Sequence, residues 1–297
     1  MSDIEIFRDR ARAAMVAMRQ VFPATPLMRN DHLSEKFGAE IWLKREDLTP
    51  VRSYKLRGAF NAMRRAQGAD LFVCASAGNH AQGMAYMCRH FGKRGVIFMP
   101  VTTPQQKIDK TRIFGYFDDT LAEAQSFCAA EGGHFLAPFD DDDVIEGQAT
   151  IAAEIEAELP GGADLIVLPV GGGGLSAGIR SYFGPDQSLK FVEPAGGASL
   201  AAAVEAGGPV TLNKVDSFVD GAAVARIGAR PWDRLNGIDR ADVLAAPEDR
   251  ICTTMLEMLN IEGIVLERVS GVVAKPHAPA TRASTTRRRR KRCMPGV

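Results

Sequence analysis

Four consecutive glycines, Gly171 to Gly174, follow an apolar run and precede a helix-like segment. Glycine has no side chain, so the backbone of such a loop approaches a ligand closely and its N–H groups converge at the positive end of the helix. A flexible surface turn is the alternative, but the apolar run Val167 to Val170 directly before the glycines argues against it. The pattern is neither GxGxxG with a following acid, which is typical of a dinucleotide site, nor GxxxxGK[ST], which is typical of a P-loop. Both of these kinds of site are therefore disfavoured. We therefore predict that a phosphate group binds to Gly171, Gly172, Gly173, Gly174 and Leu175.

A lysine, Lys55, lies at the start of a helix-like segment, directly after a turn-like stretch that contains Pro50. A lysine near a phosphate site, with a lowered pKa, forms a Schiff base with an aldehyde cofactor. Taken alone, Lys55 fits a solvated surface lysine better, because most lysines are solvated. The neighbouring motifs favour a catalytic lysine.

A third segment, Ser76 to His80, follows the apolar run Leu71 to Ala75 and opens another helix-like segment. Ser76 and Asn79, with backbone N–H groups at a helix start, are suited to hold a carboxylate and a phenolic oxygen. Helix capping by either residue is the alternative, and it is compatible with binding. His80 is a candidate general base, although a histidine beside a helix cap is more often structural.

The three segments together supply an amine nucleophile, an anion site and a carboxylate-binding turn. Pyridoxal phosphate (PLP) chemistry on an amino acid requires this set of groups. We therefore predict PLP as the cofactor, with Lys55 as the residue that binds it covalently.

Short apolar runs of strand type alternate with helix-like segments along the chain. The predicted strands are 41–43, 71–75, 96–99, 165–168 and 191–192, and the predicted helices after the first, 4–20, are 55–65, 81–90, 105–114, 144–158 and 175–182. This alternation is typical of parallel βαβ units. Such sheets place ligands at the carboxyl ends of the strands, where the three segments lie.

The net charge of zero is an average over two unlike regions. From Arg268 to the end the chain has nine Lys or Arg and no Asp or Glu, which leaves 27 basic against 36 acidic residues, a net charge of about −9, for the rest. An acidic body is typical of a metabolic enzyme and argues against nucleic acid as the main partner. Five cysteines without paired spacing predict a cytoplasmic location and no structural zinc, and no apolar run is long enough for a membrane span.

With these segments in view, the sequence resembles the threonine dehydratases (threonine ammonia-lyases) of biosynthetic type, in the tryptophan-synthase-β-like, fold type II family of PLP enzymes. The resemblance runs from about Ala24 to Glu267. Its segments occur in family order: Thr25-Pro26-Leu27, Lys44-Arg45-Glu46-Asp47, Ser53-Tyr54-Lys55-Leu56-Arg57-Gly58-Ala59, Ser76-Ala77-Gly78-Asn79-His80 and Gly171 to Leu175.

The resemblance implies a two-lobed α/β fold with open parallel sheets, in which Lys55 carries PLP and moves the α-proton. It implies that Asn79 contacts the ring oxygen and that the substrate carboxylate binds at Ser76, Ala77, Gly78, Asn79 and His80. The implied reaction converts L-threonine to 2-oxobutanoate and ammonia, the entry to isoleucine biosynthesis. The implied partner is a small molecule, L-threonine or L-serine, and we expect a homo-oligomer with no nucleic acid or membrane partner.

Four regions are expected from the pattern. They are an N-terminal helix and extended arm that pack on the large lobe (1–40), a smaller lobe (41–140), an incomplete large lobe that binds PLP (141–267) and a basic tail (268–297). Relatives have about a dozen more residues between Gly115 and Asp118, so we expect one strand of the smaller lobe to be absent. After Glu267 the family pattern stops, and a reading-frame change or a native basic arm explains the tail.

Other functions fit the same residues. Serine dehydration differs by one substrate methyl group, which gives only modest discrimination. A β-replacement synthase fits the lysine context less well, and a truncated, inactive PLP-binding protein fits the altered C-terminal region. A basic-tailed nucleic-acid binder is the remaining alternative, which strong salt dependence of binding would reveal.

Overall fold

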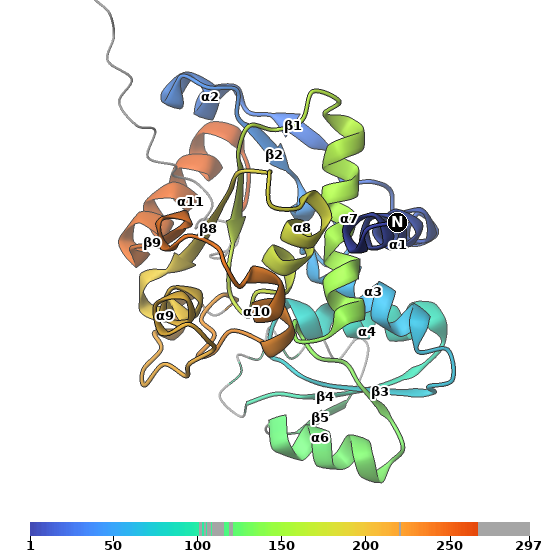
Figure 1. Cartoon of the computed structure of the whole chain (residues 1–297). Helices are drawn as coiled ribbons and strands as arrows, with labels where there is room; N and C mark the ends of the chain where they lie inside the picture. The colour runs from blue at the N-terminus through green and yellow to red at the C-terminus, as the bar shows by residue number, and fades with distance from the viewer. Residues whose placement is uncertain are drawn as a thin grey trace, which may run out of the picture.

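The computed structural model describes residues 1–100, 103, 105, 108, 116–118, 121–219 and 221–266, with the backbone alone for 116–118. Two parallel sheets form its framework (Figure 1). The first has the order β5-β4-β3-β6, with β3 (Leu71–Ala75), β4 (Arg94–Phe98), β5 (Tyr116–Asp118) and β6 (His134–Phe135). The second has the order β7-β8-β9, with β7 (Ile166–Pro169), β8 (Leu189–Pro194) and β9 (Val243–Ala246). Every strand pair in both sheets is parallel, so the predicted α/β class is confirmed.

Helices surround both sheets, and α7 runs through the centre of the molecule beside α1, α3 and α8 (Figure 1). The helices are α1 (Asp3–Met18), α2 (Asp31–Phe37), α3 (Lys55–Arg65), α4 (Asn79–Phe91), α6 (Leu121–Ala130), α7 (Asp142–Glu158), α8 (Gly174–Phe183), α9 (Ser199–Ala206), α10 (Ala229–Leu235) and α11 (Glu248–Glu262). Helix α7 begins where Asp141 accepts a 2.9 Å hydrogen bond from the N–H of Val144. Such a cap stabilises a helix by about 1 kcal/mol.

Glycines allow the central helices to approach one another closely. A Cβ atom on Gly147 of α7 would lie 2.5 Å from the carbonyl oxygen of Arg57 in α3. A Cβ atom on Gly178 of α8 would lie 2.6 Å from the carbonyl oxygen of Ile145 in α7. Close packing of α3, α7 and α8 therefore joins the start of α3 to the start of α8.

Helix α1 is amphipathic and has a capping box at its start. Ser2 accepts from the N–H of Glu5, and the Glu5 carboxylate accepts from the N–H of Ser2. The buried side chains recur at the spacing of one helix face and pack against α7 and α8: Phe7, Ala11, Ala14 and Met18.

The sequence did not predict β1 (Leu27–Arg29), β6 and β9, and the structure differs from the prediction at two further strands. The strand expected to be absent is present, because β5 pairs in parallel with β4, and residues 99–115 are long enough for a parallel crossover. The run 41–43 was expected among the parallel strands, but β2 (Trp42–Lys44) instead pairs antiparallel with β1 (Leu27–Arg29) in a separate sheet.

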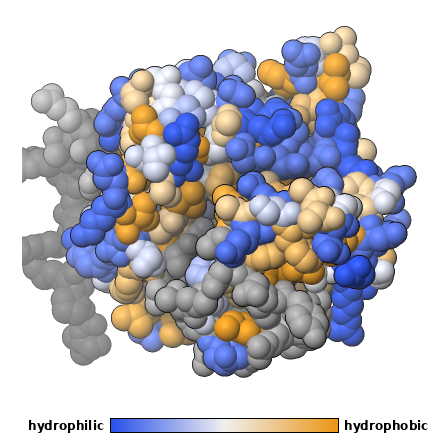
Figure 2. All heavy atoms as spheres, turned by 90° about the horizontal axis from the view of Figure 1, so that it is seen from below, coloured by the Kyte–Doolittle hydropathy of each residue, from blue (hydrophilic) through white to orange (hydrophobic). Residues whose placement is uncertain are grey.

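The predicted domain boundaries at 40, 140 and 267 stay a prediction. The helix predicted at 105–114 lies largely outside the described residues, and the predicted tail 268–297 lies wholly outside them. Within the described ranges, no helix is both long and apolar enough to cross a bilayer. Figure 2 shows the molecule from below, where hydrophobic and hydrophilic residues lie side by side on the surface.

Candidate active site

Lys55 is the first residue of α3, and its side chain is partly buried. Its Nζ donates a 2.8 Å hydrogen bond to the carbonyl oxygen of Pro138. The same nitrogen lies 5.6 Å from the centre of the Tyr54 ring and 5.8 Å from the centre of the Phe139 ring. Burial lowers the pKa of Lys55 to about 8. About a tenth of this amine is therefore uncharged at pH 7, far more than for an ordinary lysine, and a nucleophile or base requires the uncharged form.

The glycine loop, defined as Gly171 to Gly174, connects β7 to α8. Gly173 has a φ of +92°, which only glycine adopts readily, and no side chain caps α8. Among the described residues, no acceptor receives the backbone N–H groups from Gly171 to Ser176. These free donors stand at the positive end of a ten-residue helix, so the loop is suited to bind an anion.

The side chain of Ser176 adds a second free polar group near this end of α8. Ser176 is fully buried, and its Oγ has no hydrogen-bond partner among the described residues. A buried hydroxyl without a partner is costly, because it has lost its water without gaining a protein acceptor or donor. Sequence reasoning missed Ser176, since a serine in the first turn of a helix has no distinctive pattern.

The turn Ser76 to His80 follows β3 at the carboxyl end of the first sheet. The hydroxyl of Ser76 accepts a 3.2 Å hydrogen bond from the N–H of Gly78, and Asn79 is the first residue of α4. The N-cap position of α4 is Gly78, without a side-chain cap, so neither Ser76 nor Asn79 caps the helix. The start of α4 thus presents backbone N–H groups, which suit a carboxylate.

His80 is buried, and its Nε2–H donates a 2.9 Å hydrogen bond to the carbonyl oxygen of Leu136. Burial, together with the nearby charge of Lys55, lowers the pKa of His80 to about 3. The imidazole is therefore neutral at physiological pH, and so weak a base fits a structural role. His80 and Lys55 donate to carbonyl oxygens only two residues apart, those of Leu136 and Pro138, so the two side chains lie in the same region.

The segment Leu136 to Phe139 connects the three predicted site segments. Leu136 receives the hydrogen bond of His80, Pro138 receives that of Lys55, and the Phe139 ring packs on the glycine loop. Sequence reasoning missed Pro138 and Phe139 as site residues. No local sequence pattern identifies them; the structure places them after β6, at the same sheet edge as the turn Ser76 to His80.

The residues present fit PLP by the chemistry of their groups. An anion site with free N–H donors fits the phosphate, and an amine with a lowered pKa fits the aldehyde. The individual site roles stay predictions. The parallel α/β fold and this set of groups define the class of PLP-dependent enzymes.

Comparison with known proteins gives the family. The family model "Pyridoxal-phosphate dependent enzyme" matches residues 18–286, so this chain belongs to that family, and the predicted cofactor is confirmed. The biosynthetic L-threonine dehydratase IlvA of Bacillus subtilis (strain 168) is 45% identical in an alignment of 267 residues, which covers 84% of this chain and 63% of that protein. The protein of the same name from Corynebacterium glutamicum is 42% identical over 86% of this chain and 64% of its own length.

Comparison with solved structures also finds a threonine deaminase. The processed form of threonine deaminase isoform 2 from Solanum lycopersicum matches with a TM-score of 0.84 and 33% identity, over 91% of this chain and 77% of that one. The predicted resemblance to biosynthetic threonine dehydratases is thus confirmed. The chain spans a little under two thirds of the length of the curated relatives named above.

Proposed function

We propose that this chain converts L-threonine to 2-oxobutanoate and ammonia by elimination of water and release of the amino group. Lys55 carries this proposal, because its partly buried amine has a pKa of about 8 and hydrogen-bonds to the segment that packs on the glycine loop. The names of the relatives, L-threonine dehydratase and threonine deaminase, support the choice of substrate.

The cofactor site has two parts in this proposal. PLP, when bound, supplies an aldehyde that takes up an amino group and a ring that accepts the electron pair left by the α-proton. The glycine loop and Leu175 hold the phosphate through backbone N–H groups at the start of α8. The uncharged Nζ of Lys55 would take the α-proton of the substrate. The β-hydroxyl needs one proton to leave as water, and the ammonium formed on Lys55 would supply it, so that the protons balance.

The substrate carboxylate is assigned to the start of α4. Ser76, Ala77, Gly78, Asn79 and His80 form this part of the site, as predicted from the sequence. Backbone N–H groups at the end of a parallel strand bind such an anion without a formal positive charge. His80 contributes through its backbone and through its hydrogen bond to Leu136, which holds the turn in place.

The test is the formation of 2-oxobutanoate from L-threonine by the purified chain with PLP, compared between wild type, Lys55→Ala and a surface control, Lys190→Ala. Lys190 lies in β8 and its side chain is ion-paired with Asp242, away from the predicted site segments in the sequence, so its loss should leave the reaction unchanged. Product from the wild type and the control, but not from Lys55→Ala, supports the proposal. PLP binding without product would instead identify an inactive PLP-binding protein.

L-Serine is the second substrate to measure, with pyruvate as its product. The relatives favour threonine, and one methyl group contributes roughly 1–3 kcal/mol of discrimination in an apolar pocket. We expect the ratio kcat/KM to favour threonine. An equal or higher value for serine would make serine dehydration the better description.

We further propose a cytoplasmic location and a homo-oligomeric state. Cys74, Cys88 and Cys128 are free and buried, which suits a reducing compartment. Large apolar side chains on α11, among them Leu256 and Ile261, are exposed in the single chain and support an interface. Light scattering of the purified protein tests the oligomer, and a monomer would refute it.

A further inference from the structure

Phe139 occupies space that three glycines leave open, with its ring against two of them and its Cβ and backbone against the third. A Cβ atom on Gly172 would lie 2.2–2.3 Å from three carbons of the ring, and one on Gly228 would lie 3.0 Å from its Cδ2. A Cβ atom on Gly174 would lie 3.0 Å from the Cβ of Phe139 itself. Side chains at these positions would displace the ring, so the local sequence is built around it.

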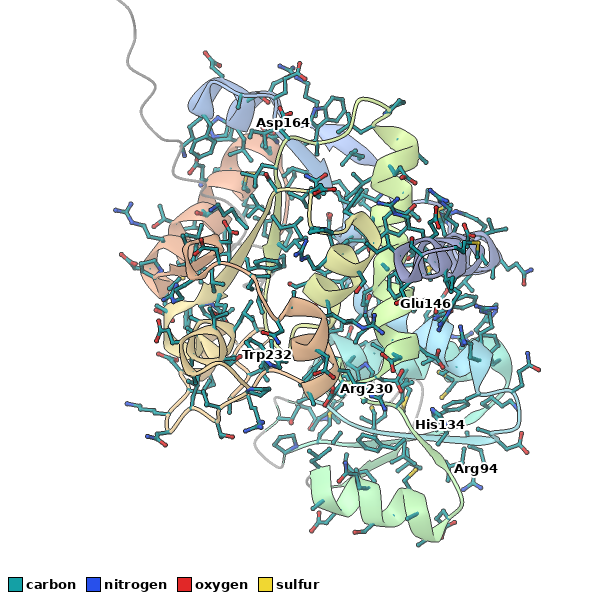
Figure 3. The ribbon with its side chains drawn as sticks, in the orientation of Figure 1. Arg94, His134, Glu146, Asp164, Arg230 and Trp232 are labelled. Carbon is teal, nitrogen blue, oxygen red and sulfur yellow. The ribbon has the colours of Figure 1, made fainter. Side chains whose placement is uncertain are left out.

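The residues after Phe139 fix its position from two sides. The Asp140 carboxylate accepts hydrogen bonds of 3.2 and 2.8 Å from the N–H groups of Ala229 and Arg230 at the start of α10. Asp141 caps α7. Figure 3 labels Arg230, whose guanidinium also pairs with Asp142 at the first turn of α7. The backbone at Phe139 is thus held between the starts of two helices.

Lys55 lies directly beside this ring. The carbonyl oxygen of Pro138 receives its hydrogen bond, and its Nζ is 5.8 Å from the centre of the Phe139 ring. An aromatic face attracts an ammonium ion, while the bulk of the ring excludes water and disfavours the charge. Burial lowers the pKa of Lys55, and the rings of Tyr54 and Phe139 both have their centres near its Nζ, at 5.6 and 5.8 Å.

We infer that Phe139 is a positioning residue of this site, whose ring keeps the Lys55 amine out of water and holds it next to the glycine loop. The inference rests on the proposed function, because it takes Lys55 as the reacting amine. It adds a residue whose ring packs on the loop and has its centre 5.8 Å from the amine.

The experiment measures the pKa of Lys55 in the full chain without added PLP. Competitive labelling with acetic anhydride across a pH series, followed by peptide mass spectrometry, gives the fraction of uncharged Lys55 amine. The variants are Phe139→Leu and Phe139→Ala. The matched control is Phe135→Leu, which removes a partly buried ring four residues earlier that packs with Leu71 and Phe98 instead. Circular dichroism establishes that each variant is folded.

We expect Phe139→Ala to raise the pKa of Lys55 by at least one unit towards its ordinary value of 10.5. At pH 8 this shift lowers the uncharged fraction, and with it the labelling rate, about fivefold. Phe139→Leu should give a smaller rise in the same direction, and Phe135→Leu should give none. If Phe139→Ala does not fold, Phe139→Leu decides the question.

Gly172→Ala tests the same contact from the other side. Its new methyl group displaces the ring, so this variant should also raise the pKa of Lys55, and it should add nothing in the Phe139→Ala background. A wild-type Lys55 pKa in folded Phe139 variants would overturn the inference. Because the labelling needs no catalysis, a shifted pKa with no threonine turnover would remove the proposed function and leave the role of Phe139 standing.

Discussion

Replacement of Glu154 by glutamine should destabilise the fold, because Glu154 is the centre of a buried charge cluster. Arg57 is fully buried and donates hydrogen bonds of 2.9 and 2.8 Å to the two carboxylate oxygens of Glu154. It also donates two bonds of 2.7 Å to Glu46. Lys44 and Arg19 contact the same Glu154 carboxylate. Arg57, which lies two residues after Lys55, connects α7 to α3 in this cluster. Arg19, directly after α1, connects α7 to the N-terminal region.

The expected magnitude follows from two independent considerations. Burial alone would raise the pKa of Glu154, but the hydrogen bonds and charges of Arg57 and Lys44 outweigh it and lower the pKa from 4.5 to about 2. A difference of this size between the folded and unfolded states corresponds to about 3 kcal/mol of stability at neutral pH. Removal of one partner from a buried ion pair costs about 3–5 kcal/mol. We therefore expect a loss of about 3 kcal/mol.

The assay is urea unfolding at pH 7, with Glu156→Gln as the matched control on the same helix. Glu156 is exposed and bonds to Arg12 and Tyr182, so its replacement should cost no more than about 1 kcal/mol. The contribution of Glu154 is fully present above pH 4.5 and is lost as the pH falls towards 2. The gap between wild type and Glu154→Gln should therefore narrow to about half at pH 3.

Two results would refute this reasoning. One is a Glu154→Gln protein as stable as Glu156→Gln at pH 7. The other is a stability difference from wild type that does not decrease on acidification, because the loss would then have a cause other than the charge of Glu154.

Gly147→Ala should lower the free energy of unfolding by about 2–3 kcal/mol, because its Cβ atom would lie 2.5 Å from the backbone oxygen of Arg57. Urea titration measures this change, and an unchanged unfolding midpoint would contradict the prediction. Burial raises the pKa of Glu193 to about 7, so the wild type should lose roughly 3 kcal/mol of stability as the pH rises from 4.5 through 7. The stability of Glu193→Gln should depend less on pH than that of the wild type. Equal dependence of stability on pH in the two proteins would exclude Glu193 as the cause. In the folded protein, iodoacetamide should modify the exposed Cys252 and leave Cys74 unmodified, because Cys74 is buried and burial also raises the pKa of its thiol. Mass spectrometry of the labelled peptides is the assay, and modification of Cys74 in the folded protein would contradict this prediction.

Local patterns in the sequence predicted the parts of the fold that depend on local chemistry. The helix 55–65 was predicted with the bounds of α3, because a turn containing Pro50 precedes a clear helical periodicity. The strand β9 (Val243–Ala246) was missed, since a short run rich in alanine has no strand pattern of its own. The absence predicted for β5 was wrong, because it relied on the spacing in relatives instead of the length available in this chain.

The site could be predicted only where its groups stand in recognisable motifs. Lys55 and the glycine loop have such motifs, and the structure connects them through the segment that contains Phe139. The role of this segment depends on contacts with residues far away in the sequence, which no local pattern predicts. The side chain of Glu154 is a similar case, because its partners Arg57 and Lys44 come from α3 and β2.

The most direct test of the central claim is to identify the lysine that binds PLP. The full chain is incubated with PLP, reduced with borohydride and digested, and the modified peptide is located by mass spectrometry. We predict that Lys55 carries the pyridoxyl phosphate group, whereas Lys44, whose amine is ion-paired with Glu154 and Glu158, does not. Modification of another lysine with Lys55 unmodified would contradict the assignment of this site.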